Sequence, residues 1–252
     1  MQMVLLTALG VGGATMIGAL LGFVFKKTSH RFNDIVLAFA AGVMLAAAVV
    51  GLVLESLAFA GKFPLVTTVL GVFCGAVCVN LLDKLVPHLH KLTGADQEGH
   101  PEQSQKMGKV LLFVMAIAIH NLPEGIAAGV GFGTGNVQEA MVIAGGIALQ
   151  NIPEGMVIIA PMLATGISRG RTLAIALATG VVEVIGTLIG YFAVTLSAAI
   201  LPFALAFAGG CMLYVISDEM IPETHAHGSE RGATYALIMG FCLMLAFDFM
   251  MG

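Results

Sequence analysis

Long apolar stretches alternate with short polar segments along almost the whole chain of 252 residues. A lipid bilayer has an apolar core about 30 Å thick, and an α-helix needs roughly 20 residues to cross it. The apolar stretches have this length, and most charged residues lie between them. The pattern therefore predicts eight membrane-spanning helices, at approximately 3–25, 33–59, 64–86, 108–131, 137–163, 171–195, 198–220 and 232–250.

The composition supports the same fold class. The chain is 58% apolar and only 10% charged, with a mean hydropathy of +0.98, whereas soluble domains contain about 25% charged residues. We expect an all-α integral membrane protein with a single transmembrane domain, residues 1–252, in a bacterial-type cytoplasmic membrane. No basic segment precedes the first span and no cleavage site follows it, so we expect no signal peptide. No basic groove or aromatic platform indicates a nucleic-acid partner.

The positions of Lys and Arg predict the orientation. Nearly all of them fall at or beside the loops that follow spans one, three, five and seven, and only Lys62 lies on the other side. By the positive-inside rule these loops are cytoplasmic, and both termini face outward. The segment 87–107 is polar, contains His88, His90 and His100, and is expected to be a flexible cytoplasmic loop. Its histidines could contact metal or simply be solvated.

Two neighbouring spans contain nearly the same polar hexapeptide, HNLPEG at 120–125 and QNIPEG at 150–155. Residues four apart share one face of a helix, so each copy presents its first side chain beside its glutamate, with an asparagine one position round. The candidate side chains are His120, Asn121 and Glu124 in the first copy and Gln150, Asn151 and Glu154 in the second.

The two motif glutamates need a partner inside the membrane. An ionisable side chain at bilayer depth costs at least about 2.5–3.5 kcal/mol, and neither span has a Lys or Arg in its interior. The candidate partners are a bound cation, a proton, or both in turn. Pro123 and Pro153 should also kink their helices and free a carbonyl oxygen in the preceding turn. Carboxylate, imidazole and amide groups together suit a borderline divalent cation.

Other acidic residues differ in how well they suit this site. Glu183 is the only charged residue in the sixth span and lies near its middle, so it is the best third contributor. Asp218 and Glu219 lie toward the cytoplasmic end of the seventh span, where a charged side chain is easier to accommodate.

At this point the chain resembles a known family. The paired HNLPEG and QNIPEG motifs resemble those of the ZIP (Zrt-, Irt-like) family of divalent metal transporters. The segments LLDKLVPHLH and ISDEMIPETHAHG resemble its prokaryotic GufA-type branch, and the resemblance covers nearly the whole chain. It implies uptake of Zn²⁺, and also of Cd²⁺, Fe²⁺ or Mn²⁺, into the cytoplasm, with the metal as cargo and no catalytic cofactor.

The resemblance also implies a binuclear metal centre in which both motif glutamates bridge. The first metal would be held by His120, Glu124, Gln150 and Glu154, and the second by Asn121, Glu124, Asn151, Glu154 and Glu183. Glu219 matches an acidic position on the route to the cytoplasm, where Asp218, His225 and His227 would follow. Many family members have His in place of Gln150, and some have Asp in place of Asn151. The strictness of the zinc preference and the number of metals therefore stay open.

For the mechanism, we expect alternating access, and the resemblance suggests that the helices bearing the site move as a body. A channel-like route through the same ligands stays open. A membrane-embedded zinc-dependent hydrolase is the alternative from another class, although the chain has no HExxH motif. A proton-driven carrier of an organic solute would need more aromatic or cationic groups. Pairs of small residues, such as Gly18 and Gly22, predict a compact bundle and are compatible with a homodimer.

Overall fold

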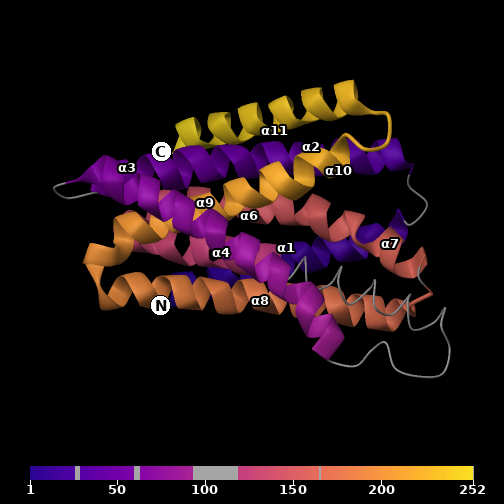
Figure 1. The fold of residues 1–252 in the computed structure, drawn as a ribbon, viewed down its shortest axis with the longest axis horizontal. Helices are drawn as coiled ribbons and strands as arrows, with labels where there is room; N and C mark the ends of the chain where they lie inside the picture. Colours follow the sequence, from indigo (N-terminus) through magenta and orange to yellow (C-terminus); the bar gives the residue numbers. More distant parts are fainter. Residues whose placement is uncertain (26–28, 60–62, 93–118, 165, 252) are drawn as a thin grey trace.

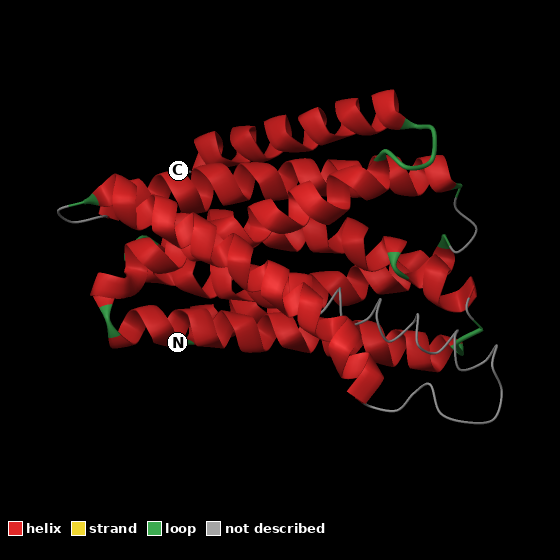
Figure 2. Ribbon diagram, viewed as in Figure 1, coloured by secondary structure: helices red, strands yellow, loops and turns green. Residues whose placement is uncertain are grey.

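The computed structural model describes residues 1–25, 29–59, 63–92, 119–164 and 166–251, and all regular structure in these ranges is helical (Figure 2). The elements, in chain order, are α1 (Gln2–Val24), α2 (His30–Ala46), η1 (Ala47–Leu54), α3 (Glu55–Phe59), α4 (Pro64–Leu92), a helix over 119–131, η2 (Phe132–Thr134), α6 (Val137–Val157), α7 (Ile159–Ala164), α8 (Arg169–Leu196), η3 (Ala198–Ile200), α9 (Leu201–Val215), η4 (Ile216–Met220), α10 (Ile221–Thr224) and α11 (Glu230–Met251).

Seven of the described helical segments are long and apolar enough to cross a membrane. They correspond to the predicted spans other than the one at 108–131, so the all-α membrane fold is confirmed. Within that remaining span, residues 119–131 are helical, and 108–118 lie outside the described residues. The count of eight spans and the outward orientation of the termini stay predictions.

The end of α4 differs from the expected loop boundary. The helix continues to Leu92, several residues into the segment 87–107 that was predicted to be a loop. A helix can extend beyond the apolar length that the bilayer requires, so the hydropathy pattern does not mark its end. The rest of this segment, including His100, lies outside the described residues, and so do the side chains of His88 and His90.

Two helices contain a π-helical turn, which the apolar pattern did not predict. The segment η1 joins α2 to α3, and η4 joins α9 to α10, in each case without a break in the helical backbone. A π-helical turn inserts extra residues relative to an α-helix and so changes which way the following side chains face. The turn η4 contains Asp218 and Glu219, and its helical phase therefore decides where these carboxylates lie.

The helices form two groups that lie side by side in an elongated bundle (Figure 1). We call α1, α6, α8 and the helix over 119–131 the site bundle, because they carry the two motifs and Glu183. We call α2, α4, α9 and α11 the flanking bundle, in which α2 packs against α11 and α4 against α9. The groups meet where α2 and η1 pack against α6 and where α8 contacts α9.

Glycines allow the helices within each group to approach closely. A Cβ on Gly18 of α1 would overlap the carbonyl oxygen of Ile152 in α6. Three more glycine pairs with the same spacing also lie at contacts between helices of this chain: Gly71 and Gly75, Gly125 and Gly129, Gly186 and Gly190. The predicted compact packing is confirmed. These faces are already used within the chain, so they provide no argument for a homodimer.

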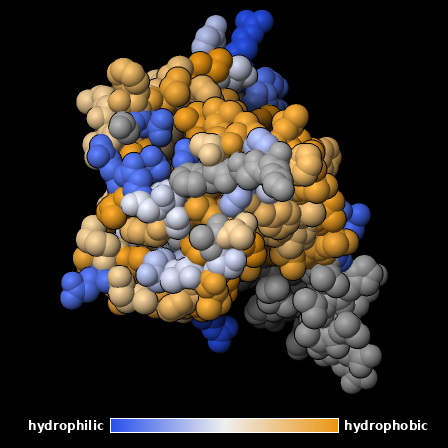
Figure 3. All heavy atoms as spheres, turned by 90° about the vertical axis from the view of Figure 1, so that its left-hand side faces the viewer, coloured by the Kyte–Doolittle hydropathy of each residue, from blue (hydrophilic) through white to orange (hydrophobic). Residues whose placement is uncertain are grey.

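Large apolar side chains cover the outside of the molecule. On α4 they include Phe73 and Val77, and on α11 Leu243 and Phe249, all of them exposed. Seen from the end where α3 lies, apolar residues occupy much of the surface and hydrophilic residues gather in patches (Figure 3). Apolar faces of this extent require a bilayer around them, which agrees with the predicted membrane location.

Candidate metal centre

Both hexapeptides and Glu183 come together inside the site bundle. Asn121 and Glu124 come from the helix over 119–131, Gln150 and Asn151 come from α6, and Glu183 comes from α8. All five side chains are buried, with at most 1% of each residue exposed. His120 and Glu154 are half-buried beside them. The helical backbone continues past Pro123 and Pro153, and the carbonyl oxygens that these prolines should free stay a prediction.

Three neutral groups surround the carboxylate of Glu183. The Thr15 hydroxyl of α1 donates to Oε1 at 2.7 Å, and the Asn151 amide donates to Oε2 at 2.8 Å. The Asn121 amide donates to Oε1 as well. The two motif asparagines therefore bind the two oxygens of one glutamate from opposite helices. Hydrogen bonds from neutral donors solvate a buried carboxylate without cancelling its charge.

Glu124 has a different environment. The Gln150 amide nitrogen donates to its Oε1 at 2.6 Å and lies 3.3 Å from the Asn151 side-chain oxygen. The second carboxylate oxygen of Glu124 has no hydrogen-bond partner. The carboxylate of Glu154, the equivalent residue of the second motif, makes no hydrogen bond to any described residue. Its carboxylate is close enough to Glu124 and Glu183 to interact with both electrostatically.

Three buried oxygen atoms at this site lack a partner among the described residues. They are Oδ1 of Asn121, Oε2 of Glu124 and Oε1 of Gln150. A buried polar atom without a partner costs about 1–3 kcal/mol, so three in one place indicate a missing ligand or proton. Since all three atoms are acceptors, the group that satisfies them must be a cation or a hydrogen-bond donor.

The charges at the site favour a cation over a neutral donor. Glu124, Glu154 and Glu183 bring three carboxyl groups together, and no Lys or Arg among the described residues forms an ion pair with any of them. In the described part of the chain, no three His, Cys, Asp or Glu side chains converge on one point as a complete metal site. The amides of Gln150 and Asn151 lie between the carboxylates, so a metal ion here would also use amide oxygens.

His120 connects this site to the flanking bundle. Its Nε2 lies 2.7 Å from Oε1 of Glu219, and the two side chains are 12% and 31% exposed. The contact crosses from the site bundle to the π-helical turn η4, so Glu219 is a direct neighbour of the motif. Asp218 is exposed in the same turn and makes no hydrogen bond or ion pair to a described residue.

Comparisons with known proteins decide the family. The family model described as "ZIP Zinc transporter" matches residues 88–248. The chain is 46% identical over 182 residues to the zinc transporter GufA of Myxococcus xanthus, covering 72% of this chain and 70% of that protein. It is 39% identical over 251 residues to the zinc transporter ZIPB of Bordetella bronchiseptica, covering 95% and 78%. This chain belongs to the ZIP family.

Membership of the ZIP family confirms several predictions. The identity to GufA supports the predicted resemblance to the GufA-type branch. The chain is also 32% identical to a zinc transporter ZupT of Chlorobium chlorochromatii, over 92% of this chain and 91% of that protein. The chain is a transporter of a bacterial-type membrane that crosses the bilayer several times. The membrane hydrolase that we considered from sequence is not supported.

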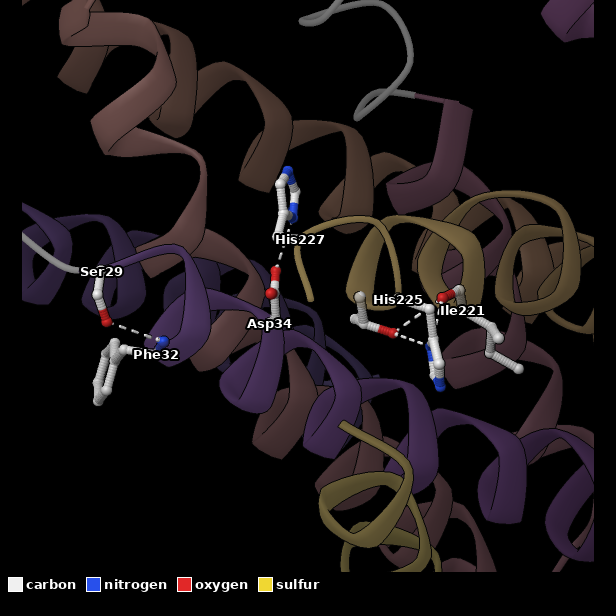
Figure 4. Close-up of polar contacts among 7 residues, drawn as sticks. Ser29, Phe32, Asp34, Ile221, His225 and His227 are labelled. Atoms are coloured by element: carbon white, nitrogen blue, oxygen red, sulfur yellow. Dashed lines mark hydrogen bonds and ion pairs between the residues drawn. The ribbon is translucent and has the colours of Figure 1, made fainter. Parts of the chain in front are cut away.

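The two histidines that follow α10 in this ZIP protein have different contacts (Figure 4). His225 uses both ring nitrogens: Nδ1 lies 2.8 Å from the carbonyl oxygen of Ile221, and Nε2 lies 3.1 Å from the Thr234 hydroxyl. His227 instead contacts Asp34 of α2 through Nδ1 at 3.0 Å. The sequence placed both residues on the same route, but their environments differ.

The sequence did not single out Thr15 or the role of the motif glycines. Thr15 donates to Glu183 across two helices, and no periodicity connects residues so far apart in the chain. Gly125 packs against the backbone of Glu183, and Gly155 packs against the carbonyl oxygen of Thr15. The final glycine of each hexapeptide therefore brings a neighbouring helix close to the site. The repetition of Gly in both motifs was the available signal.

Proposed function

We propose that this ZIP-family chain takes up Zn²⁺ through the site between the helix over 119–131, α6 and α8. The observation that supports this best is the group of three orphaned acceptor oxygens around three carboxyl groups. No Lys or Arg among the described residues neutralises these carboxylates, and a divalent cation would satisfy both the charge and the oxygens.

The full ligand set is binuclear, with Glu124 and Glu154 bridging. One metal is held by His120, Glu124, Gln150 and Glu154, and the other by Asn121, Glu124, Asn151, Glu154 and Glu183. The amides of Asn121, Gln150 and Asn151 now direct their nitrogens at carboxylates. A 180° turn of such an amide exchanges nitrogen for oxygen at nearly the same position. Cation binding would make this exchange favourable, because the oxygen is the ligand atom.

The ligand types set the metal preference. Imidazole from His120 favours zinc and cadmium, whereas the amide and carboxylate oxygens also suit manganese and iron(II). We therefore propose Zn²⁺ as the main cargo, with Cd²⁺, Fe²⁺ and Mn²⁺ as weaker ones. Since carboxylates bind a metal in their deprotonated form, metal binding at Glu124 and Glu154 releases any protons held there.

The transport route follows from the proposed topology. With eight spans and both termini outside, the ends that carry Arg31, Arg169 and Arg231 face the cytoplasm. Metal enters from the opposite side, reaches the motif residues and passes to Glu219, which already contacts His120. Asp218 lies one residue away in η4 and would receive the metal at the exit.

Alternating access at this site would proceed by movement of the site bundle against the flanking bundle. Glycine contacts join α1, α6, α8 and the helix over 119–131 backbone to backbone, which supports their moving as one body. The contact between His120 and Glu219 crosses the boundary through side chains only, so it can break and re-form.

The test is metal uptake into proteoliposomes with Zn²⁺, Cd²⁺, Mn²⁺ and Fe²⁺. We expect Glu124→Ala and Glu154→Ala each to abolish saturable uptake, because each substitution removes a carboxylate that bridges the two metals. Glu230→Ala is the matched control, since Glu230 is an exposed carboxylate at the start of α11. Glu183→Ala should bind one zinc ion fewer per chain than the unaltered protein.

Two outcomes would contradict the proposal. Uptake that survives both motif substitutions would show that the metal does not pass through this site. Flux that rises linearly with metal concentration, without saturation, would favour a channel-like route over alternating access.

A further inference from the structure

A second cluster of His and Asp side chains lies at one end of the bundle. It consists of His30 and Asp34, one turn apart on α2, and His227 in the turn between α10 and α11. Figure 4 shows Asp34 and His227 pointing toward each other from these two segments. The group lies at the same end of the bundle as Arg31 and the start of α11, and this end is cytoplasmic in the proposed topology.

Asp34 is the buried member of this group. Only 4% of its side chain is exposed, and among the described residues its one ion pair is with His227. The second carboxylate oxygen, Oδ2, is buried and has no hydrogen-bond partner. Thus a carboxylate group is held out of water, and the imidazole of His227 is its ion-pair partner among the described residues.

The contact with Asp34 determines which nitrogen of His227 is available. A carboxylate oxygen can only accept, so the 3.0 Å contact places the ring proton on Nδ1. In the neutral ring the lone pair is then on Nε2, which makes no hydrogen bond to a described residue. Histidines that bind metals commonly donate their other N–H to a carboxylate in this way, which orients the ring and makes the free nitrogen a better ligand.

His30 supplies a second imidazole at the same place. Its ring stacks on that of His227, with centroids 4.8 Å apart and an angle of 23° between the ring planes. Both residues are exposed, so small rotations of their side chains can bring two ring nitrogens to one ion. Imidazole nitrogens, one of them backed by a buried carboxylate, suit zinc or a similar cation, and not magnesium or calcium.

We propose that His227 and His30 form a second metal site, at which Asp34 acts as a positioning residue and a borderline divalent cation binds through two imidazoles. With only two protein ligands, the remaining positions are filled by water, and the ion exchanges readily. Such a site is suited to capture metal that has left the buried centre. This role in capture rests on the proposed transport function. Binding itself does not depend on transport.

The test is histidine modification by diethyl pyrocarbonate, followed residue by residue with mass spectrometry. The protein is the full chain in detergent with Glu124→Ala and Glu154→Ala, so that the buried centre cannot contribute and failure of uptake has no bearing. We expect Zn²⁺ to slow modification of His227 and His30 together. Mg²⁺ should not slow it, because imidazole is a poor ligand for that ion.

The chain contains its own control residue. His225 is two positions from His227, but both of its ring nitrogens already have partners, so zinc should leave its modification rate unchanged. Asp34→Asn should raise the zinc concentration needed to protect His227 by about 10–100-fold, the usual effect of losing such a carboxylate partner. His227→Gln should remove the protection of His30. Because this variant alters only an exposed turn, it still tests the proposal if Asp34→Asn does not fold.

Three results would overturn the proposal. Modification of His227 at the same rate with and without zinc would show that the contact with Asp34 is a structural ion pair only. Protection equal at His225 and His227 would reflect a general effect of the metal on the protein. Protection of His30 that persists in His227→Gln would show that the two imidazoles do not share an ion.

Discussion

The two hexapeptides are nearly identical in sequence, but only two of their four polar or small positions, the asparagine and the glycine, have equivalent contacts in both copies. The first residue and the glutamate do not. Asn121 and Asn151 are equivalent, because each donates to one oxygen of Glu183. Gly125 and Gly155 are equivalent as well, because each packs against the backbone of a neighbouring helix. The positions that support the packing and the shared glutamate therefore keep the symmetry of the repeat.

The first position and the glutamate break that symmetry. His120 is half-buried and contacts Glu219 across the boundary between the bundles, whereas Gln150 is fully buried and donates to Glu124. Glu124 is fully buried and its carboxylate is hydrogen-bonded, whereas Glu154 is half-buried and its carboxylate makes no hydrogen bond to a described residue. In each copy one of these two side chains is half-buried and the other is packed in the interior, but the half-buried one is the first residue in the first copy and the glutamate in the second.

The largest effect should come from the equivalent glycines. In Gly125→Ala and Gly155→Ala the new Cβ would overlap the backbone of α8 or α1, and such overpacking costs ~1–3 kcal/mol or more. We expect both variants to lose most of their folded, monodisperse protein, measured by size-exclusion chromatography and thermal unfolding. Gly13→Ala on α1 is the control, since nothing lies near its added Cβ. A stable Gly155→Ala would contradict the close packing at this motif.

The asparagines test whether the two copies really are equivalent. Asn121→Ala and Asn151→Ala each remove one hydrogen bond to the buried carboxylate of Glu183, worth ~1.5–3 kcal/mol for a charged acceptor. We expect similar losses in the free energy of unfolding for the metal-free protein. The measurement is denaturant unfolding monitored in detergent. A clearly larger loss for one asparagine would show that the symmetry at Glu183 is only apparent.

The smallest effect should come from exchanging the first positions. His120→Gln removes the only imidazole at the buried site among the described residues, and Gln150→His adds one in the packed interior. Imidazole favours zinc over manganese, so we expect the ratio of zinc to manganese uptake to fall severalfold in the first variant and rise in the second. Competition between the two metals during proteoliposome uptake measures this ratio. An unchanged ratio in both variants would indicate that oxygen ligands alone set the preference.

Much of the buried site could be predicted from the sequence because helical periodicity is local. Residues four apart share a face, so the sequence alone placed His120 beside Glu124 and Gln150 beside Glu154. The hydrogen bonds that form are different ones, because His120 contacts Glu219 and Gln150 donates to Glu124 of the other motif. The position of Glu183 as a lone charge in an apolar span also identified it correctly as a neighbour of the motifs. Thr15 could not be found in this way, because its contact with Glu183 joins helices 168 positions apart in the chain.

The sequence by itself determined that this chain is a helical membrane protein and which polar groups it carries into the bilayer. Apolar length and the absence of compensating Lys or Arg are properties of single segments, and hydropathy measures them directly. Only the tertiary structure decided which of these groups meet. The π-helical turn η4 brings Glu219 to His120, and the turn after α10 brings His227 to Asp34. Both contacts depend on helix phase and on packing between distant segments, which no local pattern encodes.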